Sequence, residues 1–200
     1  MFIELTDILR CPRAHAESYL VLAPRAMEGR RVIRGVLGCP VCQAEYPIVE
    51  GVVEFGSGLR PPGPLAGQPP VYDAGALLAF FDLAGPGGYV CVVGGAARHA
   101  AELAAAAGVH VVAVNPPDAV APRDAVSVLR TDDALPIKGR QVRAVALGAA
   151  HAAAPWLDEA VRVLLPGLRL VVEDDTARPV GATDLARGAG LLVAEKSGRG

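Results

Sequence analysis

Short apolar runs alternate with helix-forming segments along the second half of the chain, and this alternation limits the fold more than any other feature. Residues 89–93 and 110–114 are apolar runs, and the alanine-rich segment 98–107, which ends at Gly108, lies between them. Runs that are apolar on both faces and separated by a helix are typical of a parallel sheet covered on both sides. The pattern therefore predicts a doubly wound α/β fold with right-handed crossovers.

Further segments continue the alternation. Asp73 is expected to cap a helix that runs to residue 81, because its carboxylate can accept N–H bonds of the first turn. Together the apolar runs predict about five parallel strands. The remaining segments are strands at 127–129, 142–147 and 169–173, a helix at 156–165, and a last strand at 191–195.

A segment rich in proline and glycine, GSGLRPPGPLAGQPP at residues 56–70, divides the chain. Its composition cannot sustain a helix or a central strand and is typical of a semi-rigid spacer. We therefore expect a small domain at residues 1–56, a linker at 57–70 and the α/β domain at 71–200.

Three of the four cysteines, Cys11, Cys39 and Cys42, lie in the small domain, which indicates a local metal site more than a disulfide framework. The two-residue spacing of Cys39 and Cys42 lets both thiolates of one tight turn bind a single ion, and Cys11 with His15 completes a Cys3His set. A closed set of four ligands predicts structural zinc. The alternatives are a metal-free β-rich module and, with less support, a redox pair; fewer than roughly 60 residues rarely fold alone without a metal or a disulfide.

The segments LTDILRCP and CPVCQAEYPIVEGVVEF resemble the small zinc-ribbon family that partners and activates methyltransferases acting on tRNA, rRNA and release factors. The resemblance covers residues 1–56 and implies a protein partner. This chain departs from the family at Ala14, where the family has the second cysteine of its first pair. Either His15 replaces that ligand from the adjacent position, or the metal has been lost.

Residues 73–196 resemble the Rossmann-like class I S-adenosylmethionine-dependent methyltransferase fold, most strongly in WLDEAVRVLLPGLRLVVED at 156–174. That fold closes with a sixth and an antiparallel seventh strand, and only 191–195 fits there, so we expect a sheet truncated at its C-terminal edge. Such an open edge invites a partner or a second copy of the chain. The resemblance implies cofactor-binding positions at Gly94, Gly95, Ala96, Asn115, Asp132 and Asp133.

Two of these positions depart from the methyltransferase pattern. The family's first loop has three glycines, whereas this chain has Ala96 and Arg98 at the second and third. Asn115 stands where the family has an acidic residue that accepts the ribose hydroxyls. A left-handed alanine costs about 1–2 kcal/mol and the lost charge about 1 kcal/mol, which together correspond to roughly 30- to 150-fold in affinity.

Three functions fit these observations, and no catalytic residue is assigned. The first is a pseudo-methyltransferase that assembles with another protein; the second is an active methyltransferase with an atypical cofactor loop; the third is a domain that binds another small ligand at the strand ends. The net charge of -2 and the aromatic content of 4% argue against gripping nucleic acid. No apolar run nears the roughly 18 residues of a membrane span, and MFIELTDILR is not a signal sequence, so we expect a cytoplasmic protein.

Overall fold

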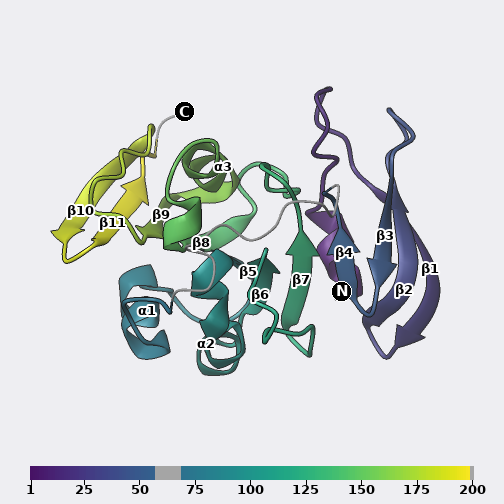
Figure 1. The fold of residues 1–200 in the computed structure, drawn as a ribbon, viewed down its shortest axis with the longest axis horizontal. Coiled ribbons are helices and arrows are strands. Elements are labelled where there is room, and N and C mark those ends of the chain that lie inside the picture. Colours follow the sequence, from purple (N-terminus) through teal and green to yellow (C-terminus); the bar gives the residue numbers. More distant parts are fainter. Residues whose placement is uncertain (57–68, 199–200) are drawn as a thin grey trace.

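The structure is a computed structural model that describes residues 1–56 and 69–198. These residues form a mixed eleven-stranded sheet in the order β1-β2-β3-β4-β7-β6-β5-β8-β9-β11-β10 (Figure 1). The strands are β1 (Val21–Glu28), β2 (Arg31–Gly38), β3 (Glu45–Val49), β4 (Val52–Glu54), β5 (Tyr89–Val93), β6 (His110–Val114), β7 (Val126–Arg130), β8 (Val142–Leu147), β9 (Leu164–Val172), β10 (Ala182–Gly188) and β11 (Leu191–Lys196).

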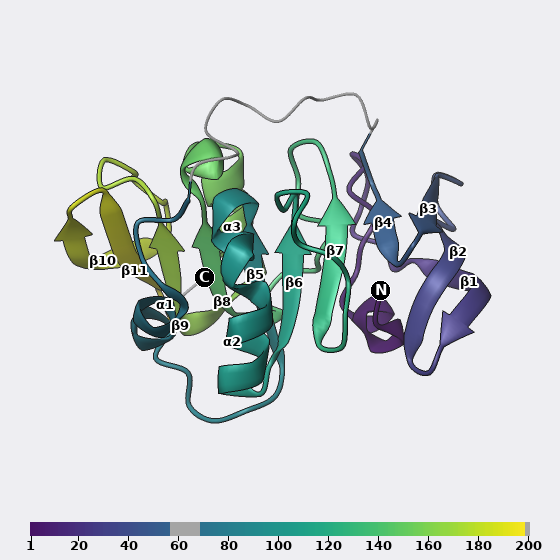
Figure 2. The same cartoon turned by 60° about the horizontal axis from the view of Figure 1, so that its bottom comes forward.

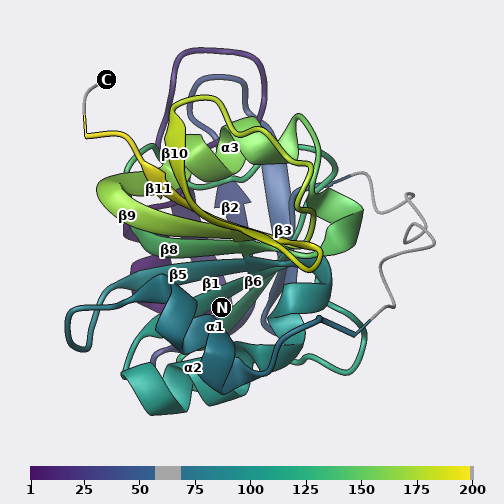
Figure 3. The ribbon, with the colours of Figure 1, turned by 90° about the vertical axis from the view of Figure 1, so that its left-hand side faces the viewer.

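Helices cover both faces of the central strands, as Figure 3 shows with α3 on one side of the sheet and α1 and α2 on the other. Trp156 and Leu157 of α3 belong to one apolar core, and Leu77 and Leu103 of α1 and α2 belong to the other. The helices are α1 (Ala74–Phe81), α2 (Ala100–Ala107) and α3 (Trp156–Val163), with 3-10 turns η1 (Ile3–Asp7), η2 (Gly94–His99) and η3 (Ala149–His151).

Five neighbouring strands, β7, β6, β5, β8 and β9, run parallel, as the sequence predicts. Asp73 caps α1, since its Oδ1 accepts the N–H of Ala76 at 2.8 Å. Two helix boundaries differ from the prediction. The segment that begins with Gly94 forms the 3-10 turn η2 before α2 starts, and α3 ends at Val163 because β9 already begins at Leu164.

The expectation of a sheet truncated at its C-terminal edge is wrong. Strand β11 pairs antiparallel with β9, and β10 pairs antiparallel with β11 to form the last strand of the sheet. Strand β10 has the sequence ATDLARG and is exposed along nearly all its length. An edge strand that buries so little needs no apolar run, and the sequence therefore lacks the signal by which the other strands are found.

The four strands of the N-terminal part continue the same sheet. Strand β4 pairs parallel with β7, with Val52 opposite Val128, so the two parts meet edge to edge (Figure 2). The predicted division at residues 57–70 stays a prediction, because residues 57–68 lie outside the described ranges. In the part of the chain that the structure describes, no helix has the length and hydropathy of a membrane span.

The first two residues fill the junction between the N-terminal strands and the parallel sheet. The ammonium group of Met1 donates to the carbonyl oxygens of Val32 at 3.0 Å and Gly51 at 2.6 Å. The ring of Phe2 stacks on His110 of β6 with centroids 4.7 Å apart. The two parts therefore share buried contacts as well as backbone pairing.

Candidate metal centre and ligand crevice

The four residues predicted as metal ligands lie together at one end of the N-terminal sheet. Cys39 and Cys42 belong to the turn between β2 and β3, which is closed by a bond from the N–H of Gln43 to the carbonyl of Cys39 at 2.9 Å. Cys11 and His15 come from the segment that follows η1. The ligand atoms of Cys11, His15, Cys39 and Cys42 all lie within 4.8 Å of one another.

The spacing of these atoms fits a tetrahedral zinc ion. The Sγ atoms of Cys11 and Cys42 are 3.7 Å apart, and Cys39 Sγ lies 3.5 Å from His15 Nε2. With bonds of about 2.3 Å to sulfur and 2.0–2.1 Å to nitrogen, a regular tetrahedron has edges of about 3.8 Å and 3.5 Å. The chemistry of the donors and their separations therefore both suit this ion.

Neighbouring groups favour the protonation states in which His15 and the cysteines can bind a metal ion. The Nδ1 atom of His15 lies 2.7 Å from the carbonyl oxygen of Ala16, which favours the tautomer that protonates Nδ1 and leaves Nε2 as the ligand. The Tyr46 hydroxyl lies 3.1 Å from Cys11 Sγ and can donate to a thiolate. Burial alone would raise the pKa of Cys39, but the backbone N–H groups of Cys42 and Val41 lower that pKa to about 6.

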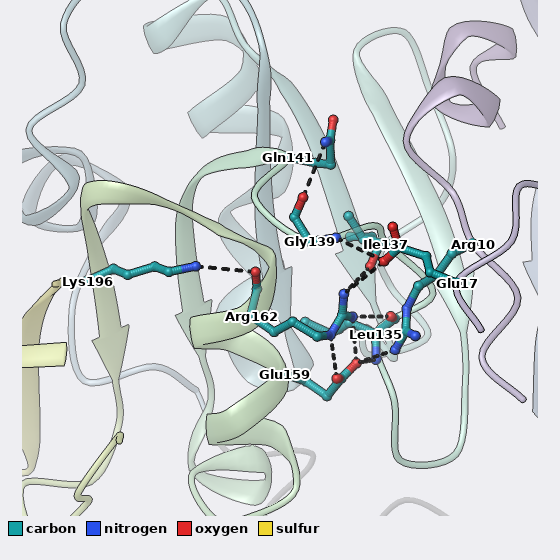
Figure 4. Close-up of polar contacts among 9 residues, drawn as sticks. All are labelled: Arg10, Glu17, Leu135, Ile137, Gly139, Gln141, Glu159, Arg162 and Lys196. Atoms are coloured by element: carbon teal, nitrogen blue, oxygen red, sulfur yellow. Dashed lines mark hydrogen bonds and ion pairs between the residues drawn. The ribbon is translucent and has the colours of Figure 1, made fainter. Parts of the chain in front are cut away.

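A charged cluster ties the metal-binding segment to α3 and to the loop after β7 (Figure 4). Glu159 accepts bonds from Arg162 at 2.6 Å and 2.8 Å, from Arg10 at 3.4 Å and from the N–H of Leu135 at 2.8 Å. Glu17 accepts from the N–H of Gly139 at 3.3 Å. Arg10 and Glu17 flank the stretch that contains Cys11 and His15. The bonds of this charged cluster therefore hold the stretch against the parallel sheet.

A second candidate site lies where β5 and β8 end side by side. The chain leaves β5 toward β6 on one side and reaches β8 on the other, so this is the topological switch point of the parallel sheet. Doubly wound sheets bind ligands in the crevice at the carboxyl ends of such strands. The loops η2 and η3 stand at this position, and η2 holds three of the predicted cofactor residues, Gly94, Gly95 and Ala96.

The two loops touch each other at this position. A Cβ atom added to Gly94 would lie 2.5 Å from His151 Nδ1, and one added to Gly148 would lie 2.8 Å from the backbone nitrogen of Gly95. The imidazole of His151 thus rests on the backbone of Gly94. The imidazole also meets the Trp156 ring edge-on, with centroids 4.6 Å apart.

Backbone strain does not explain the altered cofactor loop. Gly94 has a φ of 62°, whereas Ala96 and Arg98 are not among the described residues with positive φ. The cost predicted for a left-handed alanine is therefore not incurred, because η2 winds as a 3-10 turn in which Ala96 packs into the core.

Asn115, at the end of β6, uses both ends of its amide within the chain. Its Nδ2 donates to the carbonyl of Thr131 and its Oδ1 accepts the N–H of the same residue, each at 2.9 Å. The side chain therefore links the ends of β6 and β7. Asp132 lies against Gly56, with 2.6 Å from its Oδ1 to a Cβ added there, and Asp133 is exposed.

A buried polar pair, which the sequence analysis did not assign to a site, stands beside the crevice at the end of β9. Glu173 accepts the N–H of Ala149, the first residue of η3, at 3.0 Å through Oε2. Tyr72, which is 8% exposed, is its neighbour: burial first, and then the Glu173 carboxylate, raise the pKa of Tyr72. Tyr72 Oη and Glu173 Oε1 are both buried, and a hydrogen bond between the two side chains adds to the raised pKa of Tyr72.

No family model and no curated protein matches this chain. Among solved structures, a chain in the complex between the Haloferax volcanii Trm112 methyltransferase activator and a proposed methyltransferase is 26% identical, with a TM-score of 0.42 over 50% of each chain. The antibiotic-resistance methyltransferase Kmr is 19% identical, with a TM-score of 0.46 over 68% of this chain and 98% of that one.

A third similar structure is Haemonchus contortus phosphoethanolamine N-methyltransferase 2 in complex with S-adenosyl-L-methionine. It is 20% identical, with a TM-score of 0.39 over 50% of this chain and 27% of that one. The match to the Haloferax complex spans about half the length of the solved chain.

Proposed function

We propose that this chain is a pseudo-methyltransferase: a methyltransferase-like sheet that binds or assembles with protein, joined to a structural zinc ribbon. The observation that carries the proposal is the contact between the two loops, in which the His151 ring lies on Gly94 and Gly148 lies close to the backbone nitrogen of Gly95. A cofactor approaches a doubly wound sheet at this point. Asn115 adds support, because its Nδ2 and its Oδ1 are both bonded to Thr131.

The zinc ribbon is proposed to hold its ion through Cys11, His15, Cys39 and Cys42. A closed set of four protein ligands leaves no position for substrate, so the role is structural. Three cysteine ligands require reduced thiols, which fits a cytoplasmic location.

The partner is proposed to be another protein or a second copy of the chain, bound through the ribbon. Exposed apolar side chains occur on this part: Tyr19 is 59% exposed, Val21 53%, Val41 60% and Val49 53%. Val21 and Val49 lie on β1 and β3, and Val41 lies in the metal-binding turn. These exposed apolar side chains are the part of the ribbon that we propose meets the partner.

A calorimetric titration of metal-analysed protein with S-adenosylmethionine and S-adenosylhomocysteine tests the proposal. We expect no binding up to millimolar ligand, because the His151 ring lies on the backbone of Gly94, where a cofactor would approach the sheet. Binding at micromolar strength would refute the pseudo-enzyme. The partner is tested separately by sedimentation and by gentle pull-down. The double variant Val21→Asp, Val49→Asp should lose a stoichiometric partner. The control Val180→Asp should keep it, because Val180 is 80% exposed on another part of the chain.

One observation favours a second candidate, an active S-adenosylmethionine-dependent methyltransferase with an atypical loop. The sheet is not truncated, since β10 and β11 complete its C-terminal edge. An intact sheet is what an active enzyme of this fold would retain. Micromolar binding in the titration above would select this candidate and turn the search toward a methyl acceptor.

A further inference from the structure

We propose that Tyr46 is a positioning residue of the metal centre: its hydroxyl donates to the Cys11 thiolate, and its ring, which packs on Phe55, connects that thiolate to the junction of β4 with β7. The inference rests on the proposed function, because it takes the zinc ribbon as its starting point. It goes further by naming a side chain outside the four ligands that contributes to the affinity for the ion.

The hydroxyl of Tyr46 has one partner. It lies 3.1 Å from Cys11 Sγ, and among the described residues no other group is hydrogen-bonded to it. Tyr46 is 5% exposed, and a buried tyrosine hydroxyl usually needs such a partner. A cysteine bound to a metal ion is a thiolate without a hydrogen atom, so in the metal-bound form the hydroxyl is the donor.

This hydrogen bond acts on the charge of the centre. Three thiolates and a neutral imidazole around a zinc dication leave an excess of negative charge on the sulfur atoms. A donor to one thiolate offsets part of that excess, and a bond to an ionised acceptor is stronger than one between neutral groups. Groups that hold a ligand without touching the ion typically change metal affinity by about 10- to 100-fold.

Contacts of the ring hold the hydroxyl in place. Tyr46 belongs to β3, and its ring centroid lies 4.7 Å from that of Phe55, the residue that follows β4. The N–H of Phe55 donates to the carbonyl of Arg130, the last residue of β7, at 2.7 Å. Phe55 is therefore fixed to the parallel sheet by its backbone, and its ring transmits that position to Tyr46.

The test is a chelator competition that compares the zinc affinity of Tyr46→Phe with that of the unmodified chain. Phenylalanine keeps the ring on Phe55 and removes the hydroxyl, so we expect the affinity to fall about tenfold or more. The matched control is Tyr19→Phe. Tyr19 lies in the same part of the chain and is 59% exposed, so this variant should bind zinc as tightly as the unmodified chain.

A double-mutant cycle tests the role of the ring. Phe55→Leu should weaken zinc binding about threefold in the unmodified chain. In the Tyr46→Phe background it should have no further effect, because the hydroxyl that the ring positions is already absent. In cobalt-loaded protein, Tyr46→Phe should move the thiolate-to-cobalt charge-transfer band to longer wavelength, since a thiolate without this donor gives up its electrons more easily. Tyr19→Phe should leave the band in place.

Thermal unfolding of the zinc form shows that each titrated variant is folded, and Phe55→Met serves if Phe55→Leu does not fold. Equal zinc affinity of Tyr46→Phe and the unmodified chain would overturn the inference. An unshifted cobalt band would also overturn it, as would an equal effect of Phe55→Leu in both backgrounds. An unmodified chain that binds no zinc would overturn the proposed ribbon instead, so the two failures are distinguishable.

Discussion

Replacing Glu159 by glutamine should lower the free energy of unfolding by about 2 kcal/mol. The substitution keeps the size of the side chain. It replaces a carboxylate, which accepts hydrogen bonds from Arg162, Arg10 and the N–H of Leu135, by a neutral amide. Breaking one partner out of a buried ion pair costs about 3–5 kcal/mol. We expect a smaller cost here for two reasons. Arg162 keeps its hydrogen bonds to the carbonyl oxygens of Ile137 and Leu135, and solvent reaches the cluster.

The assay is urea unfolding at pH 7, with Asp158→Asn as the matched control. Asp158 is the preceding residue of α3 and is exposed, so its neutralisation should change stability by less than about 0.5 kcal/mol. A Glu159→Gln variant within about 0.5 kcal/mol of the unmodified chain would contradict the reasoning.

The pH dependence gives an independent check on the role of the charge. Burial alone would raise the pKa of Glu159, but Arg162, Arg10 and the N–H of Leu135 lower the pKa below its ordinary value. A lowered carboxyl pKa gives stability that is present above the unfolded pKa and is lost as the pH falls through the folded pKa. The difference between Glu159→Gln and the unmodified chain should therefore shrink on acidification, and a constant difference down to about pH 3 would point away from the charge.

Two further predictions concern the metal centre and the sheet junction. Native mass spectrometry should find one zinc ion. The variant His15→Ala should lose that ion to a chelator at least about tenfold faster than the unmodified chain, and the control His99→Ala should lose it at the unmodified rate. Unmodified protein without metal and with all thiols reactive would rule the centre out. Burial, and then the Met1 ammonium, lower the pKa of His110 to about 4 from 6.5, so stability should fall between pH 6.5 and 4 by about 2 kcal/mol after allowance for partial exposure. His110→Gln should remove the His110 part of that loss in urea titrations across the range, while burial of the Met1 ammonium, which lowers its pKa to about 5, keeps a smaller one; an unchanged pH profile would contradict the reasoning.

The sequence predicts the central strands well, because burial on both faces leaves a continuous apolar run. Strands β5 and β6 have the bounds expected from their apolar runs. The cap of α1 follows from the single residue Asp73. Strand β10 leaves no such trace, since it is an exposed edge. The pairing of β4 with β7 also has no local signal, because it joins segments that are remote in the chain.

The candidate site residues can likewise be predicted only where their signal is local in the sequence. The short C-x2-C spacing brings Cys39 and Cys42 together, and the structure places Cys11 and His15 beside them as expected. Asn115 was assigned by position, but its contacts with Thr131 depend on how β6 and β7 end. His151 follows the strand at 142–147, where the sequence favours a surface or capping histidine over a site residue, and its contact with Gly94 depends on how two loops meet.

The edge-to-edge pairing of β4 with β7 has a consequence for how the chain folds during synthesis. Val52 and its partner Val128 are 76 residues apart, so β4 leaves the ribosome long before the strand that covers it. At about 5–20 residues per second, the edge of β4 waits roughly 4–15 s for β7. Throughout that interval the unpaired backbone groups of β4 are open to another chain, including a neighbouring copy on the same messenger RNA.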